Sequence, residues 1–469
     1  MSLEKRGPVT LLRSFYQSRA YYFTIIVLSA IGVLLDIEAC MSALIICILS
    51  VRFLVVKESA GMFYPIMFLI VTMMNAASGD LSRVHYLVYC AVPLIGSMIY
   101  NAVKHKKKFH KNSVFISMLV VSGAIMLGGL FSIRAEEYFA IGNLYYIAFL
   151  GLFMVALCAF IFTLWDGEDK ECLRSEFINS ICDSGIFLAL VMVMYYLLNS
   201  GDVTSTWGIS EVIEHSPFRN IAVSYYLLSM PFAFFRSRSK ILYLFGGIVI
   251  YIACIVSGSR MGLVFGSMQF AVCMVYFIAT VEKGRWIYVA VFAVIAAIMV
   301  LSLRDILDSY VERLTEDFGS GSFINMNESR IGMIRRAVKD FFSSPIFGKG
   351  LGYTGNEDLY APEQAFDMHW YHNFIGQIIG SLGIVGIIAY MYQFYFRLSM
   401  VLKTTTPFGW LVGLMYIGVL LSGITDTGIF TPFPTVFLLN CAFMLLALSE
   451  ADAKKGKASV RIPRRKKLS

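Results

Sequence analysis

Apolar runs separated by short polar segments recur along the whole chain. Most runs hold about 20 residues, which as a helix is enough to span ~30 Å of hydrocarbon. In lipid such a run must be helical, because its backbone polar groups have to be satisfied within the segment. Fourteen candidate spans are centred near residues 27, 47, 69, 93, 122, 152, 188, 227, 248, 270, 294, 385, 416 and 438. The pattern predicts an all-α polytopic membrane protein that forms a single domain over residues 1–469.

The first two runs are the least separated, since only Asp36-Ile37-Glu38 divides them. They form either two spans or one re-entrant hairpin, so the chain has 12 to 14 spans with the same topology elsewhere. The first run follows twenty mixed residues and continues directly into the second. We therefore interpret it as a span and not as a cleavable signal peptide.

Basic residues are distributed unevenly between the two sides that alternating spans define. The chain is 58% hydrophobic and 15% charged; with the N-terminus inside, the inner segments hold 28 of its 39 Lys and Arg residues. This excess fits the positive-inside rule. The net charge of +8 therefore reflects the cytoplasmic flanks of spans and does not indicate nucleic-acid binding. The basic cytoplasmic tail at 454–469 is suited to anionic lipids of the inner leaflet, at ~1 kcal/mol per basic residue.

One long polar segment, residues 304–371, interrupts the apolar pattern, and the same topology places it outside the cytoplasmic membrane. It holds seven of the eleven outer basic residues. Ionisable groups held at a membrane surface are costly to keep there, so they are candidates for function. None of the nine cysteines lies in this loop, and no disulfide framework is expected.

The long loop contains an amphipathic helix predicted over Asn327–Phe342. Asn327 or Ser329 can cap its start, Glu328 favours the positive end of its dipole, and a Ser-Ser-Pro sequence ends it. Its apolar residues recur at helical spacing: Ile331, Ile334, Val338, Phe341 and Phe342. The opposite face carries Arg335, Arg336 and Lys339, which a helix lying on the membrane interface would explain through contacts with lipid headgroups. Arg330, predicted at the helix start beside a carboxylate, is the stronger candidate for a site.

The span after the loop begins with Tyr371-His372-Asn373 and carries Gly376, Gly380 and Gly383 at i, i+4 and i+7. A stripe of small residues lets helices pack closely in lipid. A lone histidine near an interface is often only an amphipathic anchor. His372, however, adjoins Asn373 at the mouth of a span expected to be tightly packed, which favours a functional role.

Several other classes of protein find no support in the sequence. No internal repeat is apparent, which argues against repeat-built secondary transporters. No Walker motif, dinucleotide fingerprint or Cys/His metal spacing occurs. The glycines of Gly348-Lys-Gly-Leu-Gly352 follow no predicted strand, so we expect a flexible turn there and not a phosphate-binding loop.

Three motifs follow one another over about residues 250–390. In chain order they are Ser257-Gly-Ser-Arg260-Met-Gly-Leu, Glu328-Ser-Arg330 with the stretch from Ala337 to Gly352, and Tyr371-His372-Asn373 followed by Gly-Ser-Leu-Gly383-Ile-Val-Gly386. Together they resemble the motifs of the O-antigen ligase and polymerase family. A fourth stretch, Ser216-Pro-Phe-Arg219-Asn220-Ile-Ala222, matches the family's small-residue and Asn pattern only in part. The N-terminal half resembles the family only in being polytopic.

The resemblance implies a metal-independent glycosyltransferase of the C-type membrane fold (GT-C), with no cofactor. Such enzymes take a glycan from an undecaprenyl pyrophosphate carrier at the outer face of the bacterial cytoplasmic membrane. A polymerase passes the glycan to another carrier-linked glycan, and a ligase passes it to a different lipid-linked acceptor. The implied partners are therefore the carrier-linked glycan, an acceptor, membrane lipids and, as a further candidate, a chain-length regulator.

Residue chemistry assigns roles within that expectation. Arg binds pyrophosphate in a bidentate way and stabilises charge on a departing oxygen, so Arg260 and Arg330 are the candidate donor ligands. His372 is the candidate general base, because histidine titrates near the working pH. Glu328 either orients Arg330 or competes with His372 as base. The candidate substrate-binding residues are Arg219, Arg335, Arg336 and Asn373.

Two alternatives to a polymerase stay open from the sequence. A ligase would carry the same motifs, and its lipid A–core acceptor cannot be inferred from these residues. A lipid-linked glycan flippase can also have about fourteen spans, but it has no need of a long outer loop and would place charges along a central cavity. The mid-span charges are few and the outer charges cluster near the motifs, which favours the enzyme.

Overall fold

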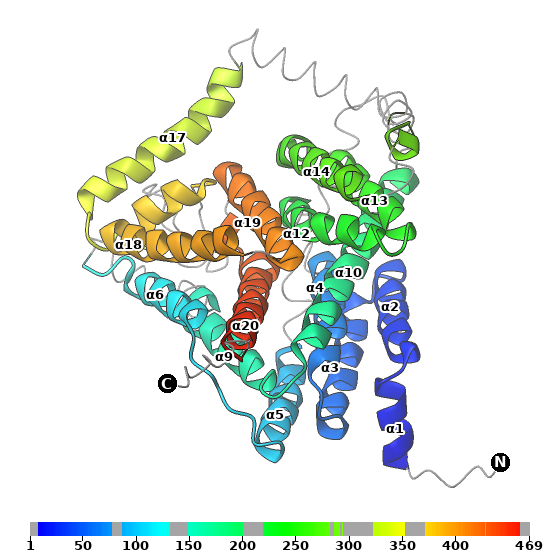
Figure 1. Cartoon of the computed structure of the whole chain (residues 1–469). Coiled ribbons are helices and arrows are strands. Elements are labelled where there is room, and N and C mark those ends of the chain that lie inside the picture. The colour runs from blue at the N-terminus through cyan, green and yellow to red at the C-terminus, as the bar shows by residue number, and fades with distance from the viewer. Residues whose placement is uncertain are drawn as a thin grey trace, which may run out of the picture.

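A computed structural model describes residues 8–76, 87–131, 149–199, 219–281, 286–290, 293, 322–351, 371–404, 406–426 and 428–459. All regular structure in these ranges is helical (Figure 1). The elements are α1 (Pro8–Tyr16), α2 (Arg19–Leu34), α3 (Glu38–Val55), η1 (Ala60–Met62), α4 (Phe63–Ala76), α5 (Leu87–Lys104), α6 (Ser113–Leu127), η3 (Phe149–Phe153), α9 (Met154–Leu164), α10 (Lys170–Asn199), α12 (Arg219–Ser237), α13 (Leu242–Val256), α14 (Arg260–Thr280), α17 (Ser322–Ser343), α18 (Phe374–Lys403), α19 (Pro407–Thr425), η4 (Gly428–Phe430), η5 (Pro432–Val436) and α20 (Phe437–Ser459).

The helices fall where the apolar runs predict them. Thirteen of the fourteen predicted centres lie within the described elements, and the one near residue 294 lies outside the described residues. By length and composition, six described helices can cross a membrane, or seven if α1 and α2, bent by 71°, form one span. The prediction of an all-α polytopic membrane protein is confirmed. The number of fourteen spans and the GT-C architecture stay predictions.

The two closely spaced N-terminal runs form separate helices that pack against each other and against α4. Asp36 reverses the chain between them with φ 54°. At 1.5 Å per residue, the 16 residues of α2 and the 18 of α3 measure about 24 and 27 Å, somewhat less than a bilayer core. Of this pair, only α3 reaches the length and hydropathy of a span by itself.

Contacts between helix ends agree with the predicted alternation of sides. At one end, Lys107 Nζ donates to Glu168 Oε1 (2.7 Å) with both side chains buried. At the other end, Gly129 N donates to Phe347 O (2.9 Å). Each contact joins two segments that alternating spans place on the same side. Both contacts are compatible with the predicted alternation, which stays a prediction.

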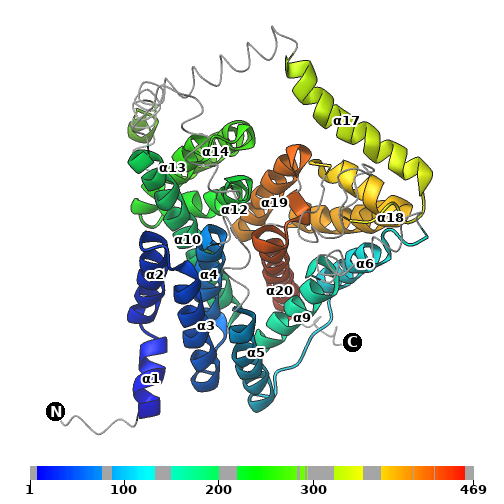
Figure 2. The ribbon, with the colours of Figure 1, turned by 180° about the vertical axis from the view of Figure 1, so that it is seen from behind.

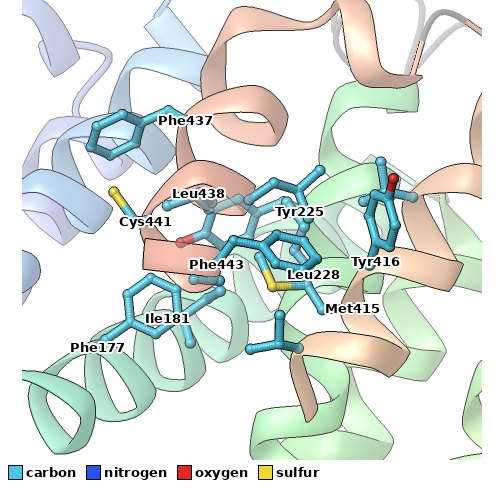
Figure 3. Packing of buried hydrophobic residues seen from close by; sticks show 14 of the residues in the cluster. Phe177, Ile181, Tyr225, Leu228, Met415, Tyr416, Phe437, Leu438, Cys441 and Phe443 are labelled. Carbon is cyan, nitrogen blue, oxygen red and sulfur yellow. The ribbon is translucent and has the colours of Figure 1, made fainter. Parts of the chain in front are cut away.

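One part of the buried core lies where α10, α12, α19 and α20 meet (Figure 3). Ser184 Oγ and the buried Tyr225 hydroxyl share a hydrogen bond of 2.6 Å, which satisfies two polar groups inside an apolar interface. Close approach depends on small residues, because a Cβ on Gly185 would lie 2.3 Å from Ser229 Oγ on α12. The side chains labelled in this cluster are Phe177, Ile181, Tyr225, Leu228, Met415, Tyr416, Phe437, Leu438, Cys441 and Phe443.

Helix α18 lies toward one edge of the molecule, with α17 along its outer side and α6 and α19 also packed against it (Figures 1 and 2). It is broken at Gly383, which has φ 59° and ψ −151°. This break positions the candidate site, because the loop after α17 enters it.

Candidate active site

The His372–Asn373 turn starts α18, as predicted. Asn373 caps the helix by accepting a hydrogen bond from Gly376 N (2.9 Å), and its amide donates to Ile424 O (2.7 Å) at the end of α19. His372 has φ 47°, a left-handed conformation that is uncommon outside glycine. The two bonds of Asn373 join α18 to α19 directly beside this conformation.

His372 faces a carboxylate. Its Nδ1 lies 3.4 Å from Asp426 Oδ1, just beyond α19, and the imidazole is 48% exposed. A carboxylate beside one ring nitrogen holds the imidazole in place and stabilises its protonated form. The other nitrogen is then available to take a proton.

Behind this turn, Tyr371 joins α17 to α18. Its hydroxyl donates to Asp340 Oδ2 (2.5 Å), and both residues are buried. Burial raises the pKa of the Asp340 carboxyl, while the Tyr371 hydroxyl and the charges of Lys349, Lys339 and Arg336 act in the opposite direction. Asp340 therefore anchors the loop helix through a polar contact that the apolar pattern does not show.

The loop after α17 pairs with the broken backbone of α18. Lys349 N donates to Gly380 O (2.9 Å) and Gly350 N to Ser381 O (2.9 Å), while Ile384 N donates to Pro345 O (2.8 Å). These bonds satisfy the backbone groups that the break leaves without helical partners. The expectation of a flexible turn at Gly348–Gly352 is wrong for the described part, since residues 348–351 are buried and held by this pairing.

The glycines of α18 make room for the loop after α17, and not only for a neighbouring span. A Cβ on Gly380 would lie 2.8 Å from the Tyr371 ring, and one on Gly383 would lie 2.6 Å from Pro345 O. A Cβ on Gly376 would meet Ala337 of α17 at 3.5 Å, an ordinary contact. Close packing is as expected, but its partners are Tyr371, α17 and the loop that follows α17.

Arg260 begins α14, as predicted, and Arg219 begins α12. Their neighbours touch: Ser259 Oγ donates to Asn220 Oδ1 (3.0 Å). The structure thus brings the partly matching stretch around Arg219 beside the serine–arginine motif. The side chains of both arginines lie outside the described residues.

Helix α17 begins at Ser322, earlier than predicted, and ends at Ser343 as predicted. The predicted start at Asn327 is therefore wrong, and Arg330 lies in the third turn instead of at the start. Arg330 precedes Ala337 by seven residues, or about two turns, so the two positions share the helix face that meets α18. Glu328 falls half a turn away from that face. The side chains of Glu328 and Arg330 lie outside the described residues.

The apolar face of α17 is not the one that packs on the protein. Ile334, Val338 and Phe342 are exposed, and Phe342 is 76% exposed. Arg335 and Arg336 are also exposed. The contact with α18 uses the small Ala337 and the buried Asp340, because a small residue allows a close approach and Asp340 has a partner in Tyr371. The interfacial position predicted for this helix leaves its apolar face available to lipid.

The sequence analysis gave no role to Asp340, Lys349 or Asp426. Asp340 could have been found as a carboxylate three residues after Ala337, and therefore on the same helix face. Asp426 follows directly after a span at the side predicted for the motifs. Within the described ranges, no group of three or more His, Cys, Asp or Glu side chains could hold a metal ion.

A family model described as O-Antigen ligase matches residues 232–391, about a third of the chain. No curated protein matches the sequence. The matched segment runs from within α12 to within α18 and contains Arg260, Glu328, Arg330 and His372, while Arg219 and Asp426 lie outside it. The matched segment contains the three motifs, so residues 232–391 are similar to the O-antigen ligase family, as the motifs predicted.

Proposed function

We propose that the protein is a glycosyltransferase that polymerises glycan repeat units carried on undecaprenyl pyrophosphate, at the outer face of the cytoplasmic membrane. One observation carries the proposal. The family segment contains both Arg260, at the start of α14, and the His372 turn, which the fold fixes against Asp426. The apolar helices support a substrate with a lipid carrier.

The donor pyrophosphate needs cations at the departing oxygen. In the proposal Arg260 and Arg330 bind it as bidentate ligands, and Arg219 adds a further contact from the neighbouring helix start. The Ser259–Asn220 hydrogen bond supports a shared location for Arg219 and Arg260. Arg330 lies on α17, the helix that packs against α18, and this placement supports a location near the His372 end of α18.

The acceptor hydroxyl needs a base. Its oxygen attacks the anomeric carbon of the donor sugar while the bond from that carbon to the pyrophosphate oxygen breaks. The hydroxyl proton passes to His372, and the negative charge stays on the pyrophosphate, where the arginines stabilise it. Asp426 lies where a carboxylate would orient the imidazole and stabilise its protonated form.

The remaining candidates take supporting roles. Both polar ends of the Asn373 amide are used within the protein, so we propose that Asn373 positions His372. Arg335 and Arg336 are exposed on α17, where they suit phosphates of the carrier or of lipid headgroups. His372 is preferred over Glu328 as the base, because Asp426 faces its imidazole.

The ligase alternative is kept because the matching family model is described as a ligase. Purified protein in liposomes would be given a carrier-linked repeat unit, with and without a lipid A–core acceptor. A ladder of longer carrier-linked glycan supports the polymerase. Glycan transferred only to lipid A–core supports the ligase.

The same liposomes test the third class of function. A flippase would move the carrier-linked unit between leaflets without changing its length. Movement without any transfer product would overturn the enzyme proposal. A matched preparation of His372→Ala protein controls for contaminating transferase.

A further inference from the structure

A cavity of about 1080 Å³ lies between the start of α10, the ends of α12 and α14, and the start of α19. Three of these helices connect it with the candidate active site. Helix α12 runs from Asn220 to the cavity, α14 runs from Arg260 to it, and α19 runs from it to Asp426. With 19 to 21 residues each, these helices measure about 30 Å, the thickness of a bilayer core. The cavity and the candidate active site therefore lie at opposite ends of these helices.

The cavity wall is basic. Arg174, Arg236 and Arg238 line it, and Glu171 is the one acidic residue among the described lining residues. Arg174 pairs with Glu171, whose side chain is largely exposed, while the arginine side chain is only 16% exposed. Three guanidinium groups around one space suit the bidentate recognition of phosphate.

Arg236 is held in a fixed position. Its Nη1 lies 3.3 Å from Asp183 Oδ1, and its guanidinium stacks on the Tyr243 ring at 3.8 Å. The side chain is 14% exposed. Arg238 is exposed and donates to the Tyr276 hydroxyl (3.4 Å). The wall thus combines one rigid arginine, one partly buried arginine and one accessible arginine.

The same cavity also has apolar walls. Apolar side chains from all four helices line it: Ile178, Phe235, Phe277, Val281 and Phe408. Helix α19 starts here, where Thr406 caps Gly409 N (3.2 Å), so the positive end of its dipole adds to the arginines. A free anion would make no favourable contact with the aromatic side chains. A phosphate joined to a hydrocarbon chain would contact both the arginines and the apolar side chains.

We propose that this cavity binds the phosphate headgroup of an anionic phospholipid from the leaflet opposite the active site. The topology predicted from basic residues makes this the inner leaflet. Arg174 and Arg238 contact the phosphate beside Arg236, and the aromatic side chains contact the start of the acyl chains. The proposal is independent of the reaction that the active site performs.

Native mass spectrometry of the purified full chain tests the site. The probes are phosphatidylglycerol and phosphatidylcholine, with sn-glycerol 3-phosphate and inorganic phosphate as competitors. The variant Arg174→Gln/Arg238→Gln removes two basic side chains and leaves the Arg236–Asp183 pair intact. The matched control Lys240→Gln/Lys403→Gln removes the same charge from exposed positions at the same end but outside the cavity.

We expect the parent and the control to retain one phosphatidylglycerol, and the arginine variant to bind it at least about tenfold more weakly, as the loss of charge-assisted bonds predicts. Equal retention by both variants, or equal retention of phosphatidylcholine, would overturn the site. If millimolar inorganic phosphate competes as strongly as the lipid does, the ligand is free phosphate and the phospholipid proposal is wrong.

A second measurement does not depend on the arginines. Cysteine placed at Ser239, which lines the cavity, would be labelled by a thiol reagent in neutral detergent and compared with the parent chain. Phosphatidylglycerol should slow labelling, and phosphatidylcholine should not. Labelling that is unaffected by phosphatidylglycerol would contradict the proposal even if the arginine variant misfolds.

Discussion

Gly348 and Gly383 meet backbone to backbone, where the loop after α17 enters the break in α18. A Cβ on Gly383 would lie 2.7 Å from Gly348 N, and one on Gly348 would lie 2.3 Å from Ser381 C. Both glycines have positive φ, 67° and 59°, respectively. Each position therefore requires glycine for two reasons: a side chain would clash with the facing backbone, and the positive φ disfavours other residues.

Alanine at either glycine should detach this loop. Gly383→Ala and Gly348→Ala each add ~1–2 kcal/mol of left-handed strain, besides the clash with backbone atoms. We expect a loss of at least about 2 kcal/mol in the free energy of unfolding, measured by denaturation in detergent. Gly332→Ala on α17 is the control, since its Cβ would meet nothing within 4 Å and helix propensity predicts a gain of up to ~1 kcal/mol. Equal effects at all three positions would refute the close contact.

The Asp340–Tyr371 hydrogen bond should couple the two residues energetically. A double-mutant cycle with Asp340→Asn and Tyr371→Phe should give an interaction energy of ~0.5–3 kcal/mol, as expected for buried partners in contact. The readout is the unfolding midpoint in detergent. Thr24→Ala on α2 with Tyr371→Phe should show no coupling, because substitutions at sites far apart in the fold have additive effects.

The raised pKa of Asp340 gives the same pair a pH dependence. Because the folded pKa lies above the unfolded one, the stability linked to this carboxyl is complete below the unfolded pKa and is lost as pH rises through the folded pKa. Asp340→Asn lacks this titration, so its stability relative to the parent should improve as pH increases. Unfolding midpoints between acidic and neutral pH would measure the difference. A constant difference would show that Asp340 titrates normally.

Arginine substitutions test the donor site. Arg260→Ala and Arg330→Ala should abolish transfer while the protein stays inserted and folded. Arg260→Lys and Arg330→Lys should also impair it strongly, because an ammonium cannot reproduce the planar fork. Lys339→Ala, which removes an exposed charge of the same helix outside the candidate site, is the matched control and should retain more activity. Near-full activity of the lysine variants would exclude bidentate binding.

His372→Ala should reduce turnover by ~10²–10⁴ with little change in donor binding, the range for losing a positioned base. Asp426→Asn should give a smaller loss, because it removes the carboxylate that faces the imidazole. Transfer assays with purified protein measure both losses. Unchanged turnover in Asp426→Asn would remove Asp426 from the mechanism.

Thiol labelling of intact cells tests the sides of the membrane. A cysteine near Gly355 in the long loop should react with an impermeant reagent, and a cysteine near Lys107 should not. The background should lack the exposed native cysteines Cys40, Cys47 and Cys172. Labelling at Lys107 alone would invert the topology and place the candidate site in the cytoplasm.

The sequence by itself determined the helical membrane class, the starts of α14 and α18, and the family of the segment from 232 to 391. These features are local, since about 20 apolar residues in lipid must form a helix and short motifs mark helix starts. Only the tertiary structure decided which carboxylates contact Tyr371 and His372. Asp426 is 54 residues away along the chain and Asp340 is 32, and neither stands out in a pattern of apolar residues. Periodicity likewise identified the apolar face of α17, but its contact with α18 uses Ala337 and Asp340. That choice depends on the space beside Gly376 and on a hydroxyl from Tyr371, which become neighbours of α17 only once the chain has folded.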